Sequence, residues 1–157
     1  MLKTLIAGLL VSLGAHAIPA AAGNLWPPRN YDPGVLVEWN TLLVDAVPDD
    51  VGVMLPQYYA LMHTAMYDAV ISIEGGHPPM RVRVPASRQA SSDAAAAQAA
   101  HDVLVALLPS GAPAFNEALA NRLGTINPNR AQLGVQVGRE VARKILEWHT
   151  AAAAHQS

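Results

Sequence analysis

The sequence LPQYYALMHTAMYDAVISI occupies residues 55–73, and its pattern determines the predicted fold class. Apolar side chains recur at the three- and four-residue spacing of an amphipathic helix, with Met66 and Val70 on successive turns. Pro56 lies in the first turn, where its missing N–H costs nothing, and two glycines follow the last apolar residue. The pattern predicts a helix over residues 56–73 whose apolar stripe faces a core.

Further stretches with the same period predict four more helices. Asn127 and Pro128 give the clearest start, because Asn caps a helix and Pro suits its first position. Residues 77–89 contain three prolines and no period, which predicts a loop or an extended strap over the helices. We expect the tail to fray from Ala151. The expected helices span residues 35–47, 56–73, 92–108, 113–126 and 128–150.

The predicted core follows from these periods. Gly134 and Gly138 lie on one face of the last helix, where each costs about 1 kcal/mol relative to Ala, so a neighbouring helix should pack closely there. The residues predicted to face inward are Leu36, Trp39, Leu43, Val47, Tyr58, Met62, Ala65, Met66, Ala69, Val70, Ile73, Ala97, Ala100, Leu104, Leu107, Leu108, Phe115, Leu119, Leu123, Ile126, Leu133, Val137, Val141, Ile145 and Trp148.

Composition supports an all-α bundle of about five helices after a signal peptide. The chain has 157 residues, 52% of them hydrophobic, and it is rich in Ala, the best helix former. Its net charge is −2, and its basic cluster of Arg81, Arg83 and Arg88 lies in the Pro-rich loop, where we expect solvated charges. Nucleic acid is therefore not an expected partner. The absence of Cys excludes disulfides.

The N-terminus has the pattern of a secretory signal peptide over residues 1–20. Lys3 precedes an apolar stretch, and Ala15-His16-Ala17 fits a small-x-small cleavage site, with a second choice at residues 20–22. A retained membrane anchor is the alternative, although the apolar stretch of 14 residues is shorter than the roughly 20 needed to span a bilayer. We expect a periplasmic or secreted protein without a later membrane span.

The mature chain then divides into two parts. Residues 21–34 contain several prolines and glycines and are expected to form a linker that Trp26 and Tyr31 fix to the body of the protein. Residues 35–150 form the helical domain.

Five residues are candidates for chemistry. His63 and Tyr67 are four residues apart and share a helix face, whereas Asp68 lies about 140° further round and should not converge with His63. Two open alternatives are a structural role for these three and a place in an active site formed with other segments. His101 and Asp102 are adjacent on a helix and point about 100° apart, which argues against a catalytic dyad. His63 and Asp68 are too few for a closed metal site, which normally takes four ligands, and a dispersed site from His63 and His101 on two helices is a further alternative.

Four segments resemble one protein family when they are taken in order. They are VEWN at residues 37–40, HTAMYDAV at 63–70, SDAAAA at 92–97 and GVQVGREVA at 134–142. Together, over residues 33–148, the chain resembles the N-terminal helical region of bacterial vanadium-dependent haloperoxidase-like proteins, which belong to the type 2 phosphatidic acid phosphatase superfamily. The resemblance implies a helical half that packs against a catalytic bundle and helps to wall its site.

The resemblance does not extend to catalytic residues. The family binds vanadate or phosphate through Lys-x6-Arg-Pro, Pro-Ser-Gly-His and Ser-Arg-x5-His-x3-Asp, so that cofactor would belong to a catalytic region further along than this sequence reaches. Here Lys144 precedes Ala151 where the first motif has Arg, Ser87-Arg88 precedes Ala94 where the third has His, and Pro109-Ser110-Gly111 ends in Ala112 instead of His. We expect that last match to be an ordinary turn between two helices. No catalytic, cofactor-binding or metal-binding residue is carried over.

Two functions follow from the sequence. The first is a truncated or split haloperoxidase- or phosphatase-like protein, inactive alone, whose partner is a C-terminal catalytic half or a second copy of itself. The second is a free-standing exported helical protein with a binding or structural role. A half-domain should expose a large apolar face near Gly134 and Gly138 or on the helix over 56–73, and a self-contained protein should not. A weaker third hypothesis is a small enzyme that uses His63 and Asp68.

Overall fold

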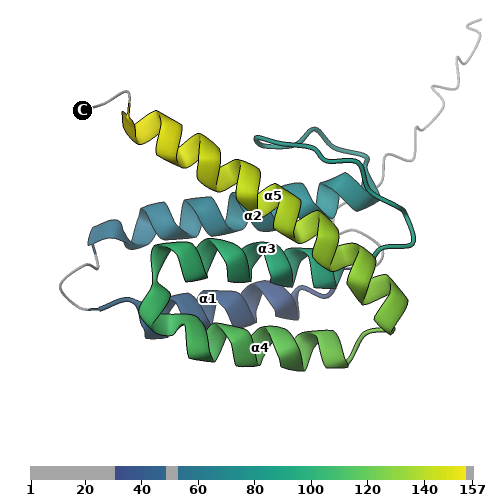
Figure 1. Ribbon diagram of the computed structural model, residues 1–157, viewed down its shortest axis with the longest axis horizontal. Helices are drawn as coiled ribbons and strands as arrows, with labels where there is room; N and C mark the ends of the chain where they lie inside the picture. The colour runs from purple at the N-terminus through teal and green to yellow at the C-terminus, as the bar shows by residue number, and fades with distance from the viewer. Residues whose placement is uncertain (1–30, 49–52, 155–157) are drawn as a thin grey trace, which may run out of the picture.

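The computed structural model describes residues 31–48 and 53–154, and in these ranges it is an all-α bundle without strands, as predicted (Figure 1). The signal peptide, Trp26 and the linker as far as residue 30 lie outside the described residues. The helices are α1 Gly34–Ala46, α2 Leu55–Glu74, α3 Ser92–Leu107, the 3-10 helix η2 Pro109–Gly111, α4 Ala112–Gly124 and α5 Pro128–Ala154.

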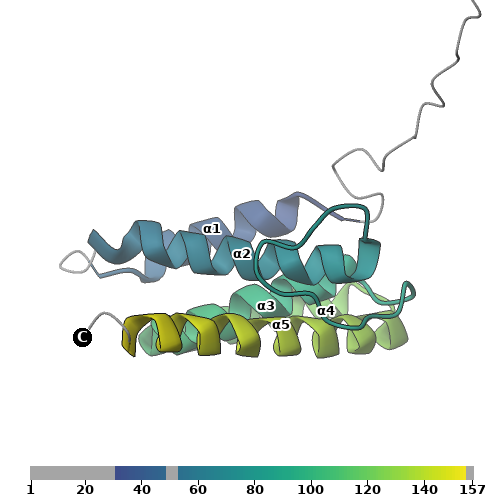
Figure 2. The ribbon, with the colours of Figure 1, turned by 90° about the horizontal axis from the view of Figure 1, so that it is seen from above.

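α3 lies at the centre of the bundle and contacts each of the other four α-helices. Figure 2 shows α1 and α2 in a layer above α3 and α5. All of residues 94–100 are buried, including Gln98. The sequence predicted burial of only one face of this helix. Its run of Ala explains the difference, because side chains this small let neighbouring helices approach from every side.

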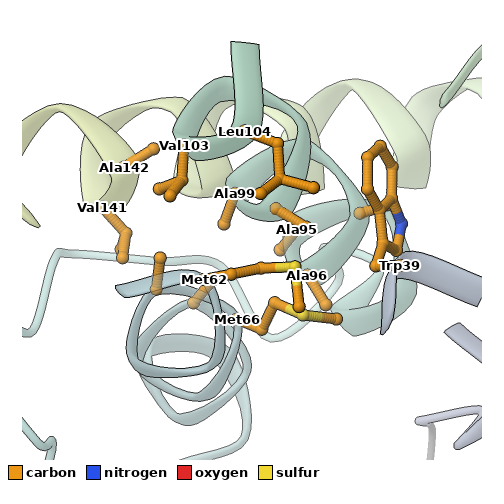
Figure 3. Packing of buried hydrophobic residues seen from close by; sticks show 14 of the residues in the cluster. Trp39, Met62, Met66, Ala95, Ala96, Ala99, Val103, Leu104, Val141 and Ala142 are labelled. Atoms are coloured by element: carbon orange, nitrogen blue, oxygen red, sulfur yellow. The ribbon is translucent and has the colours of Figure 1, made fainter. Parts of the chain in front are cut away.

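The core draws buried side chains from all five α-helices, including Trp39 of α1 and Phe115 of α4, and Figure 3 shows the part of it around α3. Met62 and Met66 of α2 point toward Ala95 and Ala96 of α3, so long side chains fill the space that small ones leave.

Most residues predicted to be inward are buried, with exceptions at the ends of helices. Trp148 is 40% exposed, because it lies on the last part of α5, where the guanidinium of Arg81 lies 4.0 Å from the centre of its ring. Val35, Leu61 and Ile71 are buried although the periods did not select them.

Close packing of α5 on α3 confirms the prediction made from the two glycines. A Cβ atom on Gly134 would lie 2.4 Å from the carbonyl oxygen of Ser91, and one on Gly138 would lie 2.5 Å from that of Ala95. These distances are shorter than any Cβ contact tolerates, so only Gly allows the two backbones to approach this closely.

The predicted helix starts are confirmed, and one predicted end is wrong. The hydroxyl of Ser91 accepts a hydrogen bond from the N–H of Ala94 at 3.2 Å and caps α3. The side chain of Asn127 accepts bonds from Asn129 and Arg130 at the start of α5. The expected fraying from Ala151 does not occur, because α5 continues through an Ala run to Ala154.

Between α2 and α3 the chain forms a long strap, residues 75–91, without regular secondary structure. Gly75 and Gly76 begin it with φ angles of 71° and 80°, a left-handed backbone that suits Gly. The strap then runs along α2 and passes close to α5 (Figures 1 and 2). Its path agrees with the extended strap that the prolines predicted.

Candidate functional site

Asp68 is a fully buried carboxylate that holds the strap against α2. It accepts hydrogen bonds from the backbone N–H groups of Met80 at 2.6 Å, Arg81 at 2.9 Å and Val82 at 2.8 Å. Three consecutive N–H groups directed at one carboxylate satisfy its charge without a cation. Both oxygens are engaged in this way, so the structural alternative for Asp68 is the one that the geometry favours.

Neighbouring side chains of α2 add to this attachment. The hydroxyl of Ser72 donates to the carbonyl of Asp68 at 2.7 Å and accepts from the N–H of Val84 at 3.1 Å. The hydroxyl of Tyr67 donates to the carbonyl of Pro78 at 3.1 Å. One face of α2 thus fixes the strap at several points along its length.

His63 lies on a different face of α2, as its spacing from Asp68 predicted. Its Nε2 is 2.7 Å from the side-chain oxygen of Asn40 on α1, and its ring meets that of Tyr59 edge-on at 5.5 Å. Burial lowers the pKa of His63 below the usual 6.5, so the ring is mainly neutral at pH 7. His63 therefore contributes a neutral polar group that joins α1 and α2.

An apolar pocket of about 180 Å³ opens beside His63 and Tyr67. It lies between α1, α2 and the strap, and Asp68 is not among the residues that line it. Burial, followed by the nearby carboxylates of Asp93 and Asp32, raises the pKa of Tyr31 to about 12, so its phenol stays protonated. The pocket is lined by Tyr31, Leu36, His63, Met66, Tyr67, Val70 and Met80.

His101 and Asp102 interact, which corrects the prediction that they would point apart. Nδ1 of His101 lies 2.7 Å from Oδ1 of Asp102, and Nε2 lies 2.8 Å from the side-chain oxygen of Asn116 on α4. The side chain of Gln98 also donates to Asp102 at 2.8 Å and draws its carboxylate toward the imidazole. Each ring nitrogen therefore has a protein partner, one on α3 and one on α4.

A charged cluster that the sequence analysis missed joins the start of the domain to α4. The guanidinium of Arg122 lies 2.7 Å from the carboxylate of Glu38 on α1 and 3.1 Å from that of Asp32. Asp93 in turn accepts the N–H of Asp32 at 2.8 Å. These residues are up to 90 positions apart in the chain, so no local pattern could have predicted the cluster.

The Pro109-Ser110-Gly111-Ala112 segment is a turn between helices, as predicted. Its first three residues form η2, which leads into α4. A Cβ atom on Gly111 would lie 2.5 Å from the ring of Phe115, which is fully buried. Packing against this ring accounts for the glycine.

The basic residues of the strap are exposed, as predicted, although two of them have specific contacts. Arg81 lies over the ring of Trp148, and Arg83 donates to the carbonyl of His77.

Within residues 31–48 and 53–154, no three His, Cys, Asp or Glu side chains are grouped as a metal site. The helices in the same part of the chain include none with the length and apolar character to cross a bilayer. Comparisons with protein-family models, curated proteins and solved structures gave no match to the chain.

Proposed function

We propose that this chain is the helical packing module of a vanadium-haloperoxidase-like or phosphatase-like protein, exported from the cell, whose catalytic partner supplies the oxyanion site. The observation that carries the proposal is that the four segments resembling that family meet in pairs. Asn40 of the first segment bonds His63 of the second at 2.7 Å. Gly138 of the fourth segment packs against Ala95 of the third, with 2.5 Å between its ideal Cβ position and the Ala95 oxygen.

Contacts of this kind are what related proteins with one fold have in common. Surface residues can change without altering how helices pack, whereas a glycine at a close approach or a polar pair between helices cannot. A resemblance concentrated at such positions supports a shared architecture over a chance similarity of Ala-rich composition.

The apolar pocket is where we expect the partner to dock. Leu36, Met66 and Met80 line its wall, and flexible Met side chains adapt to the shape of an inserted group. A volume of about 180 Å³ is suited to one large apolar side chain of the partner, which would be an anchor residue of the interface. The pocket rather than the Gly134/Gly138 groove takes this role, because α3 already fills the groove.

The test measures association and activity together. The chain is mixed with a polypeptide from the same organism that carries all three oxyanion motifs, and binding is followed by calorimetry. Vanadate-dependent bromide oxidation and phosphate-ester hydrolysis are assayed alone and in the mixture. We expect activity only in the mixture. Leu36→Asp should weaken binding by about tenfold or more, because it places a charge in the pocket.

Val44→Asp is the matched control, since Val44 is on the same helix, is 51% exposed and does not line the pocket. It should leave binding unchanged. Activity of the isolated chain that disappears in His63→Ala would overturn the proposal and support the small-enzyme hypothesis instead. Absence of binding to any such polypeptide would also overturn it.

A free-standing exported helical protein is the second candidate. The observation in its favour is that α3 covers the groove at Gly134 and Gly138, one of two places where a half-domain was expected to expose an apolar face. Light scattering and dye binding distinguish the two functions. A monomer that binds no hydrophobic dye favours the free-standing protein, and a dye-binding chain whose signal is lost on adding the catalytic polypeptide favours the packing module.

A further inference from the structure

His101 of α3 has a partner at each nitrogen of its ring, one on its own helix and one on α4. Nδ1 lies 2.7 Å from a carboxylate oxygen of Asp102, and Nε2 lies 2.8 Å from the amide oxygen of Asn116. Both partner atoms are acceptors. The side chain of His101 is 14% exposed, so its proton can exchange with water.

A neutral imidazole carries one N–H and can donate to only one acceptor, whereas an imidazolium donates from both nitrogens. We infer that His101 is a pH-sensitive link between α3 and α4, which is complete when the ring is an imidazolium and loses one of its two bonds when the ring is neutral. This inference is independent of the proposed function.

The charged surroundings support the protonated form. The hydrogen bond that Asp102 accepts from His101 raises the pKa of His101 above 6.5, with further contributions from Asn116 and the charge of Asp102. Burial and the positive charge of Arg139 on α5 oppose the shift. From α1, the uncharged ring of Trp39 meets the imidazole edge-on at 6.4 Å.

The direction of the pH dependence follows from this raised pKa. A group that binds its proton more tightly in the folded state contributes stability below its unfolded pKa of about 6.5, and that contribution is lost as the pH rises through the folded value. α4 stays in place at higher pH because Phe115 and the ion pairs of Arg122 do not depend on this proton. A rise in pH therefore weakens the attachment of α4 to α3 but does not release α4.

The first experiment is nitrogen NMR of the imidazole rings in the intact chain. We expect both ring nitrogens of His101 to be protonated at pH 6 and its titration to occur above 6.5. Asn116→Leu removes an acceptor from an exposed position and should lower the pKa of His101, while Asn116→Asp should raise it. If the amide of Asn116 instead donates to a neutral ring, Asn116→Leu raises the pKa, and that result would overturn the inference.

Thermal unfolding gives a second, independent readout. The unmodified chain should melt at a higher temperature than His101→Gln, and this difference in melting temperature should be larger near pH 6 than near pH 8. His63→Gln is the matched control with the opposite sign, because burial lowers the pKa of His63 and its contribution is lost as the pH falls. A melting-temperature difference for His101→Gln that stays constant or grows as the pH rises would contradict the pH-sensitive link.

Discussion

Asp68 is a buried carboxylate whose partners are three backbone N–H groups of the strap, at 2.6 to 2.9 Å. Asp68→Asn keeps the size of the side chain but removes its charge and replaces one acceptor oxygen with an NH₂ group. At least one backbone N–H of the strap then loses its acceptor, because it faces the new NH₂ group, which is also a donor. We expect the free energy of unfolding to fall by about 3 kcal/mol, measured by urea denaturation.

Asp45→Asn is the control for this change, because Asp45 is exposed on α1. It should alter stability by less than about 0.5 kcal/mol. If the two variants are equally stable, the strap amides have other partners in solution and Asp68 does not hold the strap.

The sequence allowed some of these side-chain positions to be predicted. Helical spacing alone separated His63 from Asp68, because an angle around a helix is fixed by residue number. The same reasoning failed for His101 and Asp102. Angles describe where side chains leave the backbone, whereas the contact depends on rotamers that Gln98 and Asn116 stabilise.

At the scale of helices, the contact between α3 and α5 depends on having no side chain at Gly138. Gly138→Ala would place a Cβ atom 2.5 Å from the carbonyl oxygen of Ala95, a backbone atom that cannot rotate away. Overpacking should exceed the gain in helix propensity, and we expect a loss of about 2 kcal/mol in the free energy of unfolding.

Gly124→Ala is the matched control, since a Cβ atom there meets nothing within 4 Å. Circular dichroism during thermal unfolding should show this variant to be as stable as the unmodified chain or more stable. If Gly138→Ala is as stable as Gly124→Ala, the contact with α3 does not limit the side chain at position 138, and only backbone entropy and helix propensity act there.

Helix starts were predictable because they depend on local chemistry. Ser91 and Asn127 cap their helices through bonds to residues two or three positions later, which any reader of the sequence can anticipate. Burial of residues 94–100 of α3 on all sides was not predictable in this way. A hydrophobic period identifies the face of a helix that is apolar, but an Ala-rich helix has no distinct face, and its position depends on what packs around it.

At the scale of the whole molecule, the sequence predicted the fold class but not the arrangement of the helices. The candidate site shows the same division. The helix that carries His63 and Tyr67 was predicted, whereas the pocket beside them also requires Leu36 from α1 and Met80 from the strap. Contacts between distant segments depend on which helices lie next to each other in space. A single sequence does not show that arrangement directly.

The central position of α3 predicts how the whole chain unfolds. α3 contacts each of the other α-helices, so the separation of any one of them from the bundle exposes part of the buried surface of α3. In a Trp26→Phe/Trp148→Phe variant, fluorescence reports on Trp39 alone, which is fully buried on α1. We expect its urea transition near pH 6 to coincide with that of helix content measured by circular dichroism. A Trp39 transition at lower urea would show that α1 separates first and that the remaining helices stay packed without it.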